Sequence, residues 1–148
     1  MHKKDFVLMA DDDMDDKNML QVLFEERKYD TRIEFVSNGL ELICYLDEIK
    51  NTNTRRYPNY ILLDLNMPKM DGRQALEEIK KNPLYRKIPI IIFSTTNNQV
   101  EIKRCYELGA NTYVVKPSSY SNLLQTIDII NSYWLKTAEI PNCDYTEQ

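Results

Sequence analysis

Histidine is nearly absent from this sequence, since His2 is the only one among 148 residues. Ser-His-Asp and Cys-His catalysis both need a histidine base, and most zinc sites need histidine or paired cysteines. A histidine phosphodonor is excluded for the same reason. Any chemistry of this chain therefore depends on carboxylates, hydroxyls and lysine.

Cysteines are also few, and the three present, Cys44, Cys105 and Cys143, lie far apart. No CxxC pair occurs, so the sequence indicates neither a zinc site nor a disulfide framework. Cys44 and Cys105 fall within helical patterns. We expect both to be small, partly buried apolar residues.

Long apolar runs and an excess of basic residues are missing as well. No run approaches the roughly 20 apolar residues that span a bilayer, and the apolar stretch near the start is too short for a signal peptide. The formal net charge is −4 and the sequence pI is about 5.1, which disfavours nucleic-acid binding. We expect a cytoplasmic protein that binds neither membrane nor nucleic acid.

Short apolar runs alternate with helical patterns along the chain. The expected strands are 6–10, 33–36, 60–63, 88–93 and 112–115. The expected helices are 14–26, a helix that follows Gly39, 73–81, 100–108 with Gly109 as its cap, and 121–133. This alternation predicts an α/β fold with a doubly wound parallel sheet and helices on both faces. The weak, alternating second strand suggests an edge.

One domain over residues 1–133 accounts for these elements. Residues 134–148 form a C-terminal tail without a clear period. Trp134, Leu135 and Ile140 continue the apolar character of the last helix into this tail. Two alternatives are open: the tail packs back onto the domain, or it contacts a dimer partner.

A set of polar side chains follows directly after the predicted strands. They are carboxylates, hydroxyls and an ammonium: Asp11, Asp12, Asp13, Asp64, Ser94, Thr95 and Lys116. Sites in such sheets lie beyond the carboxyl ends of the strands. Two carboxylates about 4 Å apart repel by roughly 4 kcal/mol at an effective dielectric near 20, so clustered ones favour a divalent cation. Oxygen ligands with room for water suit Mg²⁺.

Asp64 is the carboxylate best placed to be a nucleophile, because its strand lies at the centre of the sheet. A lysine and a hydroxyl across the pocket would suit phosphoryl oxygens. Asp13, Asp15 and Asp16 have a simpler interpretation as residues of a helix N-terminus, where aspartate caps the helix and favours its positive end.

The motifs at these strand ends resemble the receiver domain of two-component response regulators. They are "DD" after the first strand, "LLDLNMPKMDG" at the third, "FST" at the fourth and "YVVKP" at the fifth. The resemblance covers Phe6 to about Tyr133 and implies a flavodoxin-like sheet of order 2-1-3-4-5. Within the family, "KKNPLYRKIPII" and "YWLKTAEIP" resemble stand-alone regulators paired with phytochromes and other hybrid sensor kinases.

The resemblance implies that Asp64 accepts a phosphoryl group from a phosphohistidine of a sensor histidine kinase. Asp11, Asp12 and Asp64 would bind Mg²⁺, with the backbone carbonyl of Asn66 as a further ligand. The run of three aspartates leaves the metal pair ambiguous by one position; we choose Asp11 and Asp12, and Asp13 is then a cap.

The resemblance also implies roles for residues of the last two strands. The Ser94 hydroxyl would donate to one phosphoryl oxygen and Lys116 would pair with another, although a shift of one residue would give Thr95 the hydroxyl role. Tyr113 occupies the aromatic switch position, expected to turn inward as Ser94 moves. Pro117 would follow a cis peptide bond that aims the lysine.

A protein of this kind is a phosphoacceptor signalling protein and not an enzyme acting on a separate substrate. Phosphorylation is expected to bias the face of the fourth helix, fifth strand and fifth helix, where Ile102, Tyr106 and Tyr113 are candidate contacts. For Tyr106 a core-facing position is equally compatible with the pattern. Since the sequence ends soon after the last helix, we expect output through a protein contact: a downstream partner, a return phosphotransfer or a homodimer.

Two other functions compete with this interpretation. A phosphatase of the haloacid dehalogenase type also uses a strand-end aspartate and Mg²⁺, but it needs an acid two residues later, where this chain has Asn66. A receiver-like docking scaffold that is never phosphorylated is the other. Such scaffolds usually lack an acidic residue, the lysine or the nucleophile, all of which are present here.

Overall fold

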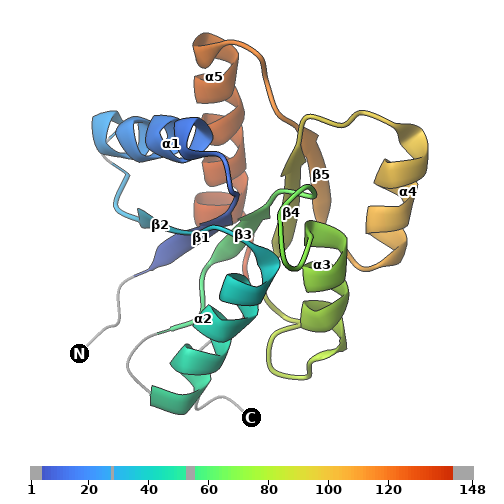
Figure 1. The fold of residues 1–148 in the computed structure, drawn as a ribbon. Coiled ribbons are helices and arrows are strands. Elements are labelled where there is room, and N and C mark those ends of the chain that lie inside the picture. Colours follow the sequence, from blue (N-terminus) through green and yellow to red (C-terminus); the bar gives the residue numbers. More distant parts are fainter. Residues whose placement is uncertain (1–4, 28, 53–55, 142–148) are drawn as a thin grey trace.

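The structure is a computed structural model that describes residues 5–27, 29–52 and 56–141. Five parallel strands form one sheet of order β2-β1-β3-β4-β5 (Figure 1). The strands are β1 (Phe6–Ala10), β2 (Arg32–Val36), β3 (Tyr60–Leu63), β4 (Ile90–Ser94) and β5 (Thr112–Val115). The helices are α1 (Met14–Glu26), α2 (Gly39–Thr52), α3 (Gly72–Lys81), α4 (Gln99–Glu107), α5 (Tyr120–Asn131) and the π-helical η1 (Ser132–Thr137). The predicted fold class and strand order are confirmed. His2 and Cys143 lie outside the described residues.

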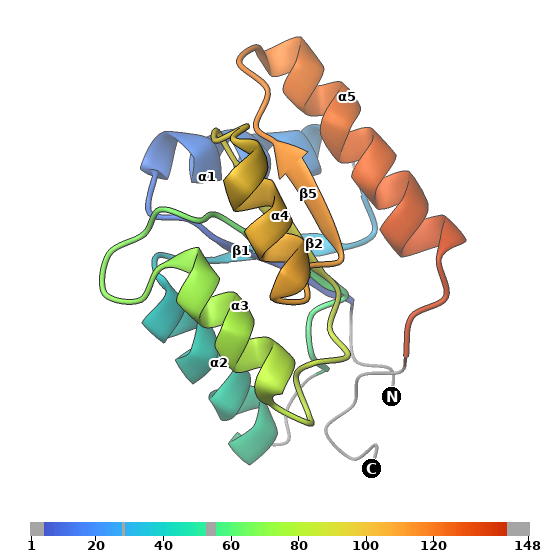
Figure 2. The ribbon, with the colours of Figure 1, turned by 90° about the vertical axis from the view of Figure 1, so that its right-hand side faces the viewer.

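The helices form two layers, one on each face of the sheet (Figures 1 and 2). On one face α2, α3 and α4 contribute Leu46, Leu76 and Cys105 to a buried apolar cluster. On the other face α1 and α5 contribute Leu23 and Ile127 to a second cluster. The right-handed crossovers of a parallel sheet produce this arrangement.

The three central strands are apolar throughout because both of their faces are covered. Every residue of β1, β3 and β4 is buried, and successive side chains alternate between the two clusters, as Leu62 and Leu63 do. By contrast β2 is an edge strand with an exposed first residue, Arg32, and two half-buried positions. The predicted edge is therefore confirmed.

The start of the fourth strand differs from the prediction. Ile88 belongs to the preceding turn, where its N–H donates to the carbonyl of Tyr85 at 3.0 Å. Pro89 has no N–H to donate to a neighbouring strand, so the strand begins at Ile90. Ser94 is included as its last residue.

Glycine ends α4 as predicted. Gly109 has a φ of +107°, in the left-handed region that glycine adopts without a steric penalty. The N–H of the next residue, Ala110, donates to the carbonyl of Cys105 at 3.0 Å, which satisfies a carbonyl of the last helical turn.

Beyond α5 the chain continues as the π-helical segment η1, although its sequence shows no clear period. Trp134 and Leu135 in this segment pack against the second apolar cluster, and Ile140 is half-buried.

The prediction for Cys44 was wrong: it is exposed, because it lies on the outer face of α2 between the buried Leu42 and Leu46. Cys105 is buried. Within the described ranges no helix is long and apolar enough to cross a membrane.

Candidate functional site

The backbone ladder of the sheet extends beyond three strand ends and places the predicted site residues at one edge. The N–H of Asp11 donates to Val36 at 3.1 Å, and the N–H of Asp64 donates to Ala10 at 3.0 Å. The N–H of Lys116 donates to Ser94 at 2.8 Å. These bonds continue the parallel pairing of the strands, so the backbone of all three residues is held in place by the sheet.

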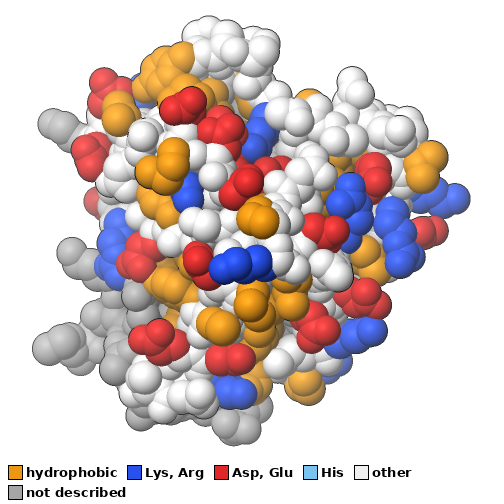
Figure 3. Space-filling model, viewed as in Figure 1, with side chains coloured by type: hydrophobic (Ala, Val, Ile, Leu, Met, Phe, Trp, Pro, Cys, Tyr) orange, Lys and Arg blue, Asp and Glu red, His pale blue; other side chains and the backbone are white. Residues whose placement is uncertain are grey.

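Three carboxylates meet at this edge. Asp11, Asp12 and Asp64 each offer an oxygen, and these oxygens all lie within 4.8 Å of one another. Asp11 is fully buried, Asp64 is 9% exposed and Asp12 is exposed, so the cluster opens to solvent on one side. Figure 3 shows acidic side chains around α1 and toward the middle of the view.

Local hydrogen bonds orient two of these carboxylates. Asp11 Oδ1 accepts from the N–H of Asp13 at 2.9 Å, and Asp64 Oδ1 accepts from the N–H of Leu65 at 2.8 Å. In each case the Oδ2 atom is the one that faces the lysine, with Lys116 Nζ at 2.7 Å from Asp11 Oδ2 and 3.6 Å from Asp64 Oδ2. The backbone bonds therefore fix which oxygen meets the ammonium.

The pKa values of Asp64 and Lys116 reflect this mixture of burial and charge. Burial raises the pKa of Asp64 to about 6, the ammonium of Lys116 opposes that rise, and the negative charge of Asp11 adds to it. Burial by itself lowers the pKa of Lys116, but hydrogen bonds to Asp11 and Asp16 and the charge of Asp64 outweigh it, so the net shift is upward. The ammonium therefore stays protonated at any physiological pH.

Asp16 is a further neighbour of the lysine, although its position in the sequence predicted only a residue of the helix N-terminus. Its Oδ2 atom lies 2.7 Å from Lys116 Nζ, as close as the Asp11 oxygen. Asp13 does act as the predicted cap: its Oδ1 accepts from the N–H groups of Asp15 at 2.8 Å and Asp16 at 3.2 Å. The one feature of the sequence that places Asp16 near the site is its position in the first helical turn after the loop that ends the first strand.

The loop after β3 is held close to the Asp64 backbone. Asn66 is exposed in this loop, and the N–H of Gly72 donates to the Leu65 carbonyl at 2.9 Å. A Cβ atom at Gly72 would lie 2.1 Å from the Asp64 carbonyl oxygen. Only glycine fits at this approach, so the turn that follows the predicted nucleophile depends on it.

The predicted hydroxyl and the predicted aromatic switch lie on neighbouring strands. Ser94 is fully buried, and its Oγ accepts from the N–H of Thr96 at 3.3 Å, whereas Thr95 is exposed. Tyr113 is half-buried, and its hydroxyl donates to the Thr96 carbonyl at 2.7 Å. Thr96 thus connects to both residues through its backbone.

The expected cis peptide bond before Pro117 is not found. No described residue has a cis peptide bond, so the bond between Lys116 and Pro117 is trans, the isomer that X–Pro bonds favour. Ion pairs with Asp11 and Asp16 orient the lysine side chain instead.

The residues at this edge suit a hard divalent cation. Carboxylate oxygens are the ligands that such cations prefer, and the exposed Asp12 leaves room for water molecules. Asp11 and Asp64 are shared, however, because both also face the Lys116 ammonium. A cation here would therefore compete with the lysine for two of its three carboxylates.

Comparison with known proteins agrees with this geometry. The family model described as the response regulator receiver domain matches residues 7–128. The chain belongs to this family. As a receiver it is a phosphoacceptor signalling protein of a two-component system, as the sequence predicted.

The relatives include a phytochrome response regulator. The chain is 33% identical over 135 residues to response regulator Rcp1 of Synechocystis, covering 91% of this chain and 92% of Rcp1. The Mn²⁺-bound Rcp1 structure has a TM-score of 0.82 at 32% identity, covering 93% of this chain and 99% of Rcp1. The phosphorylated cyanobacterial phytochrome response regulator RcpA has a TM-score of 0.85 at 33% identity, covering 95% and 99%. The predicted likeness of this receiver to phytochrome-associated regulators is confirmed.

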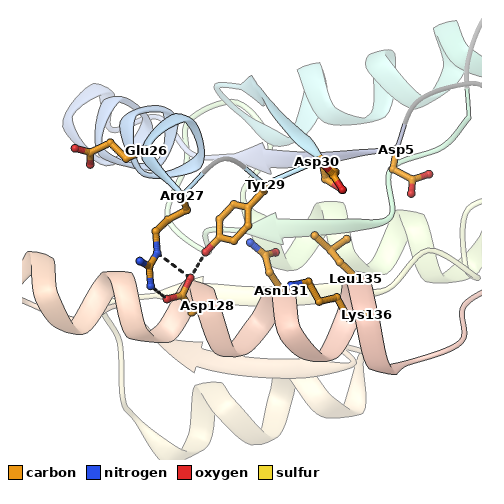
Figure 4. A pocket seen from close by; sticks show the side chains of 10 residues that line it. Asp5, Glu26, Arg27, Tyr29, Asp30, Asp128, Asn131, Leu135 and Lys136 are labelled. Atoms are coloured by element: carbon orange, nitrogen blue, oxygen red, sulfur yellow. Dashed lines mark hydrogen bonds and ion pairs between the residues drawn. The ribbon is translucent and has the colours of Figure 1, made fainter.

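A polar hollow lies at the opposite end of the sheet from the acidic cluster. It has a volume of about 530 Å³ and is lined by the end of α1, the loop before β2, the end of α5 and η1 (Figure 4). Arg27 and the hydroxyl of Tyr29 both donate to the carboxylate of Asp128 there. The hydroxyl of Tyr60 donates to Asn131 Oδ1 at 2.6 Å. These bonds join α1, the sheet and α5, so the hollow is part of the packing of that helical layer.

Proposed function

We propose that this receiver accepts a phosphoryl group on Asp64 from the phosphohistidine of a sensor histidine kinase, in a Mg²⁺-dependent reaction. The observation that supports the proposal is the position of Asp64. Its carboxylate belongs to the same acidic cluster as Asp11 and Asp12, and its Oδ2 atom lies 3.6 Å from the ammonium of Lys116.

The chemistry needs an ionised nucleophile and a balance for the phosphoryl charge. At neutral pH Asp64 is mostly ionised, since its pKa is about 6. One of its oxygens attacks phosphorus, the bond from phosphorus to the imidazole nitrogen breaks, and the imidazole leaves with the electron pair. Lys116 and the hydroxyl of Ser94 donate hydrogen bonds to the phosphoryl oxygens.

Mg²⁺ would be bound by Asp11, Asp12, Asp64 and the Asn66 carbonyl, and it would neutralise charge on the phosphoryl oxygens. These are hard oxygen ligands at the carboxyl ends of β1 and β3. A cation bound there would offset the repulsion among the three carboxylates.

Phosphorylation then changes the face formed by α4, β5 and α5. Val100, Val115 and Ile129 expose apolar side chains on these elements. Tyr113 links the site to this face, because its hydroxyl donates to Thr96 in the loop that precedes α4. The output is a protein contact: a downstream partner or a second copy of the chain.

The kinase partner is of the phytochrome type or a related hybrid sensor, and the reaction takes place in the cytoplasm. The names of the relatives support the kind of kinase, since RcpA is a phytochrome response regulator and the solved structure of RPA3017 is described as a response regulator in red light signalling of R. palustris.

Intact-protein mass after incubation with acetyl phosphate and Mg²⁺ tests the phosphoacceptor. We expect a gain of about 80 Da, one phosphoryl group, in the wild type and none in Asp64→Asn. Chelation of Mg²⁺ with EDTA should abolish the gain in the wild type. A folded wild type that gains no mass, from acetyl phosphate or from a phytochrome-type kinase, would support the scaffold function instead.

Sedimentation tests the homodimer. We expect a shift from monomer to dimer when beryllofluoride and Mg²⁺ are added, and no shift for Asp64→Asn. A wild type that stays monomeric with and without beryllofluoride would contradict dimerisation and leave a different protein as the partner.

A further inference from the structure

The Lys116 ammonium has two equally short ion pairs, and only one of them is with a residue of the acidic metal cluster. Asp11 Oδ2 and Asp16 Oδ2 both lie 2.7 Å from Nζ. We infer that Asp16 is a positioning residue that anchors the Lys116 ammonium beside Asp64 independently of the metal ligands. The inference rests on the proposed phosphorylation of Asp64.

The number of donors on the ammonium supports this role. A lysine ammonium has three N–H donors, and Asp11 and Asp16 use two of them. Asp64 Oδ2 lies at 3.6 Å, which is too far for a hydrogen bond. One donor is therefore left on the side of Asp64, where a phosphoryl oxygen would lie.

Asp11 and Asp16 differ in what else they must do. Asp11 belongs to the acidic cluster with Asp12 and Asp64, and Asp16 does not. A cation bound to that cluster would share Asp11 with the lysine and would repel the ammonium. Asp16 is not part of the cluster that would bind the cation, so its ion pair with the ammonium can persist when a cation is bound.

Helix capping does not account for the Asp16 carboxylate. The amide groups of the first turn of α1 are satisfied by the carboxylate of Asp13, which accepts from Asp15 and Asp16. The lysine, in contrast, depends on its counter-charges: its side chain is 9% exposed, and a buried ammonium without partners is costly. Asp16 is thus placed for the lysine and not for the helix.

The experiment compares Asp16→Asn with Asp15→Asn in a titration of beryllofluoride at saturating Mg²⁺. The control removes the same charge from the same helical turn, and Asp15 is exposed and makes no ion pair with any residue in the described part of the chain. We expect Asp16→Asn to weaken beryllofluoride binding roughly tenfold and Asp15→Asn to weaken it less than about twofold. Asp16→Glu, which keeps the charge, should recover most of the loss.

A lysine variant isolates the pair. In a Lys116→Met background, adding Asp16→Asn should change beryllofluoride affinity no more than Asp15→Asn does, because the anchored group is gone. An equal tenfold loss in that background would overturn the inference. So would tighter binding by Asp16→Asn alone, since Asp16 would then be a competitor for the ammonium.

A readout in the metal-free protein separates this inference from the proposed function. The ¹⁵N NMR signal of the Lys116 ammonium should be visible in the wild type and in Asp15→Asn, because the ion pairs slow its hydrogen exchange. We expect it to broaden or vanish in Asp16→Asn. A wild type that binds no beryllofluoride contradicts phosphorylation at Asp64, whereas an unchanged ammonium signal in Asp16→Asn contradicts the role of Asp16.

Discussion

The hydroxyl of Tyr106 on α4 accepts a hydrogen bond from the backbone N–H of Tyr113 on β5 at 3.1 Å. Since β5 is at the edge of the sheet, this N–H has no neighbouring strand to donate to. The same Tyr113 donates its hydroxyl to the Thr96 carbonyl. The expected switch residue is therefore tied to α4 through its backbone and to the preceding loop through its side chain.

Removing the Tyr106 hydroxyl should weaken this edge. We expect Tyr106→Phe to lower the free energy of unfolding by about 0.5–1 kcal/mol, measured by urea denaturation, because one edge N–H loses its protein partner. Tyr133→Phe is a matched control, since Tyr133 is similarly exposed and its hydroxyl has no partner among the described residues. Equal losses in the two variants would show that the Tyr106 bond contributes nothing.

Two glycine substitutions should separate stability from chemistry. Gly72→Ala would push a Cβ atom to 2.1 Å from the Asp64 carbonyl oxygen, so we expect a loss of at least about 2 kcal/mol and slower phosphorylation by acetyl phosphate. Gly109→Ala introduces strain at a φ of +107° near the start of β5, at the far end of the sheet. It should cost about 1–2 kcal/mol but leave the phosphorylation rate of the folded protein unchanged.

The raised pKa of Asp64 predicts a pH dependence of stability in the absence of divalent metal. A carboxyl whose folded pKa is about 6, above its usual 3.8, binds a proton more tightly in the folded state. Protonation of Asp64 therefore stabilises the folded state. This stabilisation is fully present below pH ~4 and is lost as pH rises through about 6. At neutral pH we expect Asp64→Asn to be more stable than the wild type by about 2–3 kcal/mol.

Denaturation of both proteins in EDTA across pH 4 to pH 8 tests this, because the difference between them isolates Asp64 from the other carboxylates. The difference in free energy of unfolding between Asp64→Asn and the wild type should increase as pH rises. It should decrease when Mg²⁺ is restored, since the cation favours the ionised carboxylate. A gap that is constant with pH would mean that Asp64 does not titrate in this range.

Sequence patterns were sufficient for the fold because the buried strands are continuous apolar runs separated by amphipathic helices. The bounds of β1, β3 and β5 agree with the prediction to the residue. The structure departs where backbone chemistry competes with the apolar pattern, as at Pro89, or where a segment packs without a regular period, as in η1.

The site could be predicted in part for a related reason. Asp11 and Asp64 directly follow strands, so their meeting is a consequence of topology. Asp16 was missed because its partner Lys116 comes 100 residues later and a position in a first helical turn has a simpler explanation. The trans bond before Pro117 was missed because an X–Pro dipeptide alone does not specify its isomer.

Charge removal at the Arg27–Asp128 pair offers a control for the experiments on Asp64. We expect Asp128→Ala to lower the urea midpoint, because Arg27 and the Tyr29 hydroxyl lose their shared acceptor. Phosphorylation of the folded variant should proceed at the wild-type rate. A slower rate under conditions where the variant is fully folded would contradict this.

The five residues of β1 separate the end of the sheet that carries the acidic cluster from the end near the Arg27–Asp128 pair. At about 3.3 Å per residue the strand spans roughly 16 Å, about twice the screening length of about 8 Å at physiological salt. Solvent-exposed charges at one end of the sheet are therefore largely screened from the charges at the other end. The exposed charges around Tyr29 could therefore be changed with little electrostatic effect on the cluster of Asp11, Asp12 and Asp64.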